Sequence, residues 1–172
     1  MKKILTLFAV VGLMIFSSCE GPQGPPGVPG RDGTDGFLAG VVEITNVSFT
    51  ATNNFSTLKV FSGPIYPTDM VLVYRLSSIV NGTDIWSVLP ETHYFPDGTL
   101  NFNYDFDFTQ NDVNIFMTGN NLTTVADVYR INQVFRIVII PADLINAIDK
   151  NNYNQVMSAL DLKESQVKKI EF

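Results

Sequence analysis

Four aspartates lie on or beside one run in which polar and aromatic residues alternate. Asp105 and Asp107 occupy alternate positions of the run Leu100–Phe108, and Asp97 and Asp112 flank it. Calcium is bound by several oxygen ligands that converge on one point, usually from a loop with a turn glycine. These aspartates do not follow the EF-hand pattern, so we predict a solvated polar face and no metal site. A calcium site is the alternative hypothesis.

Catalytic side chains are few, because His93 is the only histidine and Cys19 the only cysteine. That inventory excludes a multi-histidine zinc site, and no G-x-S-x-G elbow accompanies a serine. Glycoside hydrolysis needs only two carboxyl groups at a suitable separation, and no sequence motif marks such a pair. The chain has 17 acidic residues, so the presence of candidate carboxyl groups does not by itself indicate hydrolysis. We predict that His93 is an ordinary packed or surface residue, that the chain holds no cofactor, and that it is not an enzyme.

Trp86 is the only tryptophan, and the chain also has six tyrosines. Aromatic rings of a β-domain can form a platform on which a sugar stacks, but most of them fill the hydrophobic core. We predict the core role for these rings. A glycan contact at Trp86 is the alternative.

The N-terminus has the layout of an export signal. Two lysines precede the apolar run Ile4–Phe16, which is too short for a spanning helix of ~20 apolar residues. The run ends in Phe-Ser-Ser-Cys, which resembles a bacterial lipobox, although Phe16 stands where an aliphatic residue is usual. The resemblance implies that the signal peptide Met1–Ser18 is removed and that Cys19 is lipidated. Two or more acyl chains, palmitate among them, would anchor the protein stably to a membrane.

Glycine then occupies every third position from Gly21 to Gly36, as GPQ-GPP-GVP-GRD-GTD-GFL. This period is typical of collagen, in which only glycine fits at the crowded axis of the triple helix. A single chain of this type would instead form an extended spacer of roughly 50 Å, at ~3.1 Å per residue. A triple helix of so few triplets is marginal, so we predict a spacer. A homotrimer through the glycine repeat is the alternative.

The lipobox cysteine, the acidic Glu20, the Gly-Pro-rich repeat and a small β-domain together resemble the collagen-like lipoproteins of Bacteroidota-type Gram-negative bacteria. The resemblance covers Met1 to about Gly36. It implies an outer-membrane lipoprotein of the cell envelope, facing either the periplasm or the cell surface. It implies no particular activity.

The composition limits the partners of the exported chain. Without its first 18 residues the chain has 154 residues, with 9 basic and 17 acidic side chains and a net charge of −8. The length fits one domain, Phe37–Phe172, after the tail of residues 19–36. The acidic excess disfavours nucleic acid and direct binding to an anionic lipid surface. The expected partners are the membrane, through the lipid, and a protein or glycan ligand.

The first two thirds of the domain are predicted to form strands. The expected strands are Val41–Phe49, Leu58–Phe61, Met70–Val80, Ile85–Leu89, Thr92–Phe95, Leu100–Phe108, Val113–Met117 and Gln133–Ile140. Asn81-Gly82 and Asp97-Gly98 predict hairpins. Strict alternation in Leu100–Phe108 predicts a half-buried antiparallel strand. Gln133–Ile140 is apolar on both faces except at Arg136, which predicts a central strand.

The pattern changes at Pro141, which favours the first turn of a helix. A second short helix is expected near Asn152–Leu160, whose apolar residues recur at helical spacing. The segment Gln166–Phe172 fits either a last strand or more helix. The expected fold class is therefore mainly β, an antiparallel β-sandwich with two short C-terminal helices.

Overall fold

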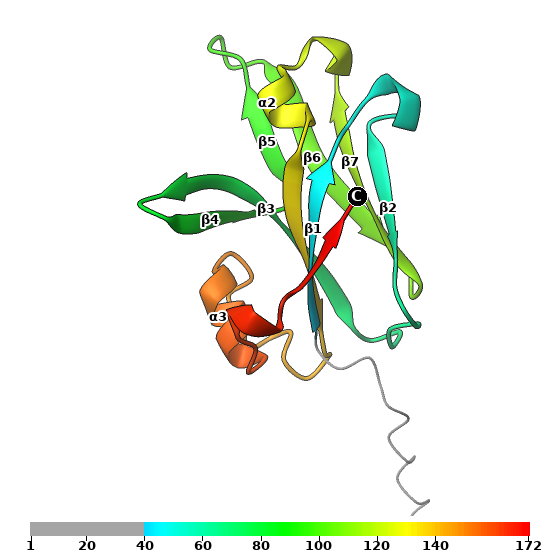
Figure 1. Ribbon diagram of the computed structural model, residues 1–172, viewed down its shortest axis with the longest axis vertical. Helices are drawn as coiled ribbons and strands as arrows, with labels where there is room; N and C mark the ends of the chain where they lie inside the picture. The colour runs from blue at the N-terminus through cyan, green and yellow to red at the C-terminus, as the bar shows by residue number, and fades with distance from the viewer. Residues whose placement is uncertain (1–39) are drawn as a thin grey trace, which may run out of the picture. The chain divides into compact units, whose positions relative to one another are not determined.

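The computed structural model describes residues 40–172, and within them two β-sheets are stacked face to face (Figure 1). The five-stranded sheet has the order β4-β3-β8-β1-β9 and the four-stranded sheet the order β2-β7-β6-β5. The five-stranded sheet comprises β1 (Gly40–Val47), β3 (Met70–Val80), β4 (Thr83–Val88), β8 (Gln133–Ile140) and β9 (Lys168–Glu171). The four-stranded sheet comprises β2 (Ser56–Val60), β5 (Glu91–Tyr94), β6 (Leu100–Phe108) and β7 (Asp112–Gly119).

Two α-helices accompany these strands in residues 40–172. Helix α2 (Asp127–Arg130) precedes β8, and α3 (Tyr153–Ala159) lies between β8 and β9. Short 3-10 turns occur at Ala51–Asn53, Leu122–Thr124 and Glu164–Gln166. The expected signal peptide, Cys19 and the glycine repeat all lie outside the described residues.

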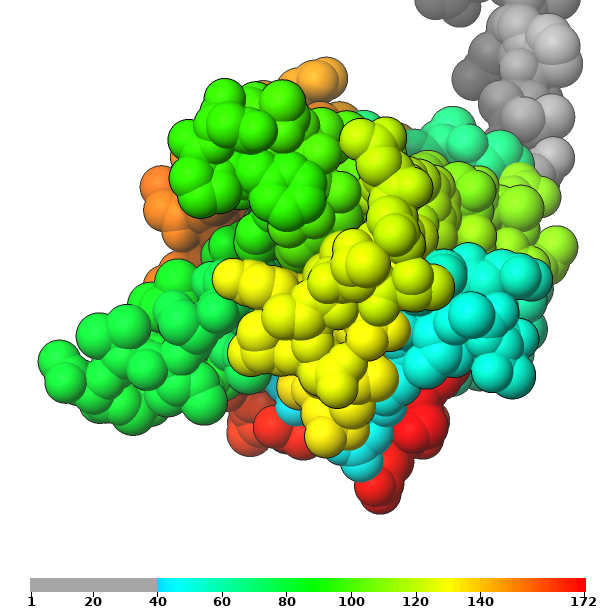
Figure 2. Space-filling view, turned by 90° about the horizontal axis from the view of Figure 1, so that it is seen from above, coloured from blue at the N-terminus to red at the C-terminus, as the bar shows by residue number. Residues whose placement is uncertain are grey.

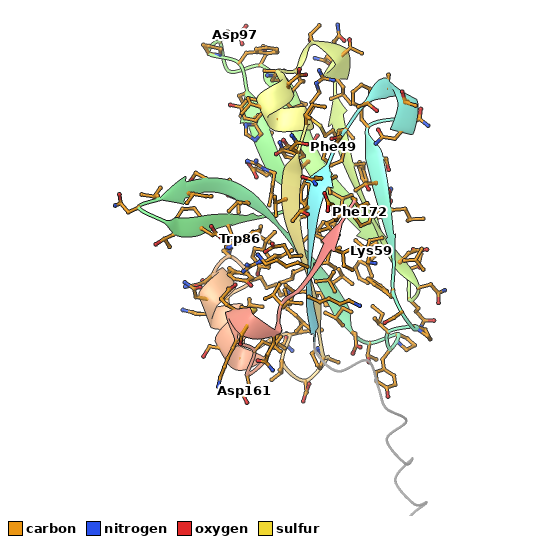
Figure 3. The ribbon with its side chains drawn as sticks, viewed as in Figure 1. Phe49, Lys59, Trp86, Asp97, Asp161 and Phe172 are labelled. Atoms are coloured by element: carbon orange, nitrogen blue, oxygen red, sulfur yellow. The ribbon has the colours of Figure 1, made fainter. Side chains whose placement is uncertain are left out.

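The hydrophobic core has two parts, one on each face of the five-stranded sheet. The first lies between the sheets, where Phe49, which is labelled in Figure 3, is fully buried and contacts the rings of Tyr104 and Phe135. The second lies between the outer face of the five-stranded sheet and the segment that carries α3, with Tyr74 and Val138 at its centre. Both parts draw their members from residues 40–172, so this region carries its own core.

Several sequence expectations are confirmed at the level of single elements. Strand β8 is central, with β3 on one side and β1 on the other, and its side chains are buried on both faces. In β6, Phe102 and Tyr104 are fully buried, while Asn101 and Asn103, which alternate with them, are only half-buried. Asn81 and Gly82 have φ of 51° and 78°, the left-handed conformations of a tight hairpin turn between β3 and β4.

Two expectations about the C-terminal part are wrong. The helix expected after Pro141 is a series of turns, in which Leu144 N donates to Pro141 O and Ala147 N to Leu144 O. A helix this short gains little from propagation, whereas Leu144 and Ile148 gain burial by packing onto the sheet. The sandwich is also not wholly antiparallel, because β9 pairs with β1 in parallel.

The hairpin of β3 and β4 projects beyond the body of the domain (Figures 1 and 2, green). Its tip carries the exposed apolar side chains Ile79, Val80 and Ile85. At its base, Trp86 and Val88 turn toward the C-terminal segment and pack against the second core. The hairpin therefore forms one wall of the space beside α3.

Candidate functional site

One row of side chains crosses the outer face of the five-stranded sheet. In the register of the neighbouring strands, Val88 of β4 is paired with Tyr74 of β3, which is paired with Arg136 of β8. Arg136 is in turn paired with Glu43 of β1, and Glu43 with Lys169 of β9. Directly paired residues of neighbouring strands point to the same face of a sheet. The row therefore passes from an apolar end at β4 to three charged groups on β8, β1 and β9.

Arg136 is the centre of this row and is almost fully buried. Its Nε lies 2.9 Å from Glu43 Oε2, and its Nη1 lies 2.6 Å from the Tyr153 hydroxyl and 2.8 Å from Glu164 Oε1. Lys169 Nζ approaches the other oxygen of Glu43 at 2.8 Å. Since burial of an unpaired charge is costly, these partners are what allow a guanidinium to lie in the second core.

The ionisation of the cluster follows from these contacts. Burial raises the pKa of Glu43, but hydrogen bonds from Lys169 and Arg136 outweigh it, so the net pKa lies below the ordinary 4.5. Burial raises the pKa of the Tyr153 phenol to about 12, which keeps its proton in place at neutral pH. The hydroxyl can thus accept from Arg136 and donate to Glu164.

Trp86 stacks above this cluster. The Arg136 guanidinium carbon lies 4.0 Å from the centroid of the Trp86 ring, and the Tyr153 ring centroid lies at 5.7 Å. A cation held against one face of an aromatic ring is attracted by its quadrupole, more strongly when it is shielded from water. The half-buried indole, labelled in Figure 3, is therefore held by its contacts with Arg136 and Tyr153.

Beside Trp86 the surface is hollowed between the β3–β4 hairpin and α3. Two adjoining hollows of about 380 and 360 Å³ share Asp84, Trp86, Tyr153 and Asn154 in their linings. The rest of the lining includes Gly82, Thr83, Ile85, Asp149, Asn151, Asn152 and Glu164. We call this surface the Trp86 cleft. It combines one indole, one phenol and many carboxylate and amide groups.

Local sequence explains how the far wall of the cleft is placed. The Asn152 side chain caps α3 by accepting from Gln155 N at 3.1 Å. Capping by Asn152 fixes the start of the helix at Tyr153, which is buried against the sheet. The Tyr74 hydroxyl donates to Lys150 O at 2.7 Å and so ties the preceding loop to β3.

The aspartates singled out in the sequence do not converge. Asp97 accepts hydrogen bonds from Thr99 in the turn before β6, Asp105 accepts one from Phe106 N, and Asp112 accepts one from Thr109. Within residues 40–172 no group of three or more histidine, cysteine, aspartate or glutamate side chains could hold a metal ion. Asp97 and Asp112 therefore serve a turn and a strand end, whereas Asp105 and Asp107 lie within β6.

His93 lies in a second polar cluster, which joins the two sheets. Arg75 on β3 donates to both oxygens of Glu91 on β5, at 2.9 and 2.6 Å, and the same carboxylate lies 2.8 Å from His93 Nε2. The His93 ring stacks on Phe102 with centroids 4.4 Å apart. No buried side-chain nitrogen or oxygen of the described region lacks a hydrogen-bond partner. The cluster therefore contributes to holding the sheets together.

Comparisons with family models, curated proteins and solved structures return no match for this chain. The part of the chain that the structure describes contains no helix long and apolar enough to cross a membrane.

The sequence singled out Trp86 only as the alternative glycan contact, and it missed the residues that hold the indole. In the sequence, Arg136 is distinguished only as the single charged residue of an apolar strand. Glu43 is distinguished only as the single charged residue of the first strand. One opposite charge in each of two buried strands is a signal that these strands are neighbours. Tyr153 and Glu164 gave no comparable signal, because their positions depend on how the C-terminal segment folds back.

Proposed function

We propose that this chain is a lipoprotein of the cell envelope, anchored in the outer membrane through Cys19, whose domain is a non-enzymatic binding module. The export signal, the lipobox and the resemblance to collagen-like lipoproteins support the anchor. The glycine repeat supports a spacer between lipid and domain, with a homotrimer as the alternative. The domain supplies the binding surface.

The observation that carries the binding role is the Trp86 cleft. Ligand sites are concave surfaces in which apolar and aromatic groups combine with a few polar groups that fix orientation. The exposed part of an indole can stack on the apolar face of a sugar ring. The surrounding carboxylate and amide groups can exchange hydrogen bonds with sugar hydroxyls. We therefore propose a glycan as the ligand, bound across Trp86.

The charge of the cleft lining restricts the class of glycan that the cleft can bind. Asp84, Asp149 and Glu164 line the cleft, and of these only Glu164 has an ion-pair partner among residues 40–172, namely Arg136. Like charges placed together without compensation are unfavourable. The lining thus supports a neutral glycan over a sulfated or uronic acid-rich one.

Binding is favoured over hydrolysis because one carboxylate of the cleft already has a partner. Glu164 Oε1 lies 2.8 Å from Arg136 Nη1, so this carboxylate is committed to an ion pair. Glycoside hydrolysis needs two carboxyl groups that can act on the glycosidic bond. Glu164 is therefore poorly suited to be a member of such a pair.

The single tryptophan provides the test, because its fluorescence reports on the cleft alone. The chain from Glu20 to Phe172, which contains both parts of the core, would be screened on a glycan array and titrated with the neutral glycans that bind. We expect an emission change on binding, and loss of array binding in Trp86→Ala with unchanged circular dichroism.

Two further variants make the test specific. Asp84→Ala removes an exposed group of the cleft lining without touching the core, and should weaken glycan binding. Tyr94→Ala removes an aromatic side chain that is 64% exposed on the other sheet, and should leave binding unchanged. Absence of binding to any neutral glycan would contradict the glycan proposal.

A further inference from the structure

Two lysines face the inside of the sandwich at one of its open edges. Lys59 on β2 is paired with Val113, and Lys168 on β9 is paired with Val42. Val113 is fully buried between the sheets, and Val42 packs against the same core. Because paired residues share a face, both lysines arise on the core-facing sides of their sheets. Lys59 is labelled in Figure 3.

Both lysines line an apolar cavity of about 230 Å³. Its apolar lining includes Val42, Ile137, Ile139 and Ile170 of the five-stranded sheet and Phe61, which follows the end of β2. Drug-sized ligands occupy pockets of roughly 300–1,000 Å³. The cavity is therefore suited to a small apolar group or to one end of a longer chain.

The two ammonium groups are not neutralised by the described chain. Within residues 40–172, neither Lys59 nor Lys168 has a carboxylate oxygen within 4.0 Å. The next residue, Lys169, points to the opposite face and is paired with Glu43. In a chain with 17 acidic and 11 basic residues, two lysines that have no acidic partner among residues 40–172 and line one apolar cavity are complementary to an external anion.

We propose that this cavity binds the end of a free medium-chain fatty acid, with its acyl chain against the apolar lining and its carboxylate between Lys59 and Lys168. The long stems of lysine can lie along the apolar wall while their charged ends stay at the mouth. The site is separate from the Trp86 cleft and does not depend on glycan binding.

The test compares octanoate with the uncharged 1-octanol, using calorimetric titration of the chain from Glu20 to Phe172. We expect octanoate to bind at least tenfold more tightly than octanol at low salt, and this preference to shrink at high salt, because salt screens exposed charges. Acetate, which lacks the acyl chain, should not bind. Equal affinities for octanoate and octanol, or no binding of octanoate, would overturn the proposal.

Matched variants locate the site. Lys59→Met with Lys168→Met keeps the aliphatic stems and removes both charges, and should abolish the preference for octanoate with an unchanged melting temperature. Lys150→Met with Lys163→Met removes two charges elsewhere and should keep that preference. If the first double variant still prefers octanoate, the anion binds at another place and the proposal fails.

Discussion

The guanidinium carbon of Arg136 lies 4.0 Å from the centroid of the Trp86 ring, on the face of the sheet that α3 covers. The charge that makes β8 unusual as a central strand therefore also positions the aromatic wall of the cleft. Stability and the proposed binding surface depend on the same side chain.

Arg136→Met should lower the free energy of unfolding by about 3 kcal/mol, because it removes one partner of a buried ion pair. It should also shift the emission of Trp86, whose ring loses the cation beside it. Denaturant unfolding and fluorescence spectra of the folded state measure the two effects. Lys169→Met is the matched comparison, since Lys169 pairs with the same Glu43 but its side chain is 66% exposed. We expect a loss of at most about 1 kcal/mol there. Equal losses in the two variants would contradict this account.

Glu91→Gln should reduce stability at neutral pH by about 3 kcal/mol, because Arg75 loses its charged partner between the sheets. Burial raises the pKa of Glu91, but the bonds from Arg75 and the nearby His93 outweigh it and bring the pKa below the ordinary 4.5. A carboxyl group with a lowered pKa stabilises the fold above its unfolded pKa and ceases to do so as pH falls through the folded pKa.

The wild-type protein should therefore lose this stabilisation below about pH 4.5, whereas Glu91→Gln should show a shallower loss over the same range. Urea unfolding at a series of pH values measures both curves. Asp127→Asn serves as control, because the Asp127 side chain is 77% exposed and its pair with Arg130 lies at the surface. Parallel curves for the wild type and Glu91→Gln would show that Glu91 does not contribute to the acid transition.

Cys19→Ser should prevent lipid attachment, since a serine hydroxyl cannot replace the thiol that is alkylated. Metabolic labelling with a fatty acid analogue should mark the wild-type protein and leave the variant unmarked. In cell fractions the variant should leave the membrane or accumulate unprocessed. Retention of an unlabelled variant in the membrane at the wild-type level would refute the anchor.

The glycine repeat should behave as a spacer in the unlipidated chain, because so few triplets make few interchain hydrogen bonds. Sedimentation of the chain from Glu20 to Phe172 is expected to show a monomer across the accessible concentrations. A trimer that disappears when the chain starts at Phe37 would instead establish the triple helix. A trimer that persists without the repeat would place the association in the domain.

Much of the fold could be predicted because its signals are local. The turn at Asn81-Gly82 depends on two adjacent residues, and the alternation in β6 extends over a single strand. The central position of β8 followed from apolar residues on both of its faces. Such features require no knowledge of which strands are neighbours.

The cleft could not be predicted, because it depends on pairings between distant segments. Arg136 and Glu43 are 93 positions apart and meet only through the register of β1 and β8. The prediction of a helix after Pro141 was wrong for a related reason. The spacing of its apolar residues reflects their contact with the sheet and not a helical periodicity. Local pattern cannot distinguish these causes.

The parallel pairing of β1 with β9 affects the order in which the domain can be completed. Asn46 and Glu171 form a hydrogen bond across 125 positions of the chain, so one edge of β1 remains open until the last strand is available. Contacts between distant positions slow folding, because the loop between them must close first. A chain emerging from its N-terminus thus stays incompletely folded until residues 168–171 have emerged.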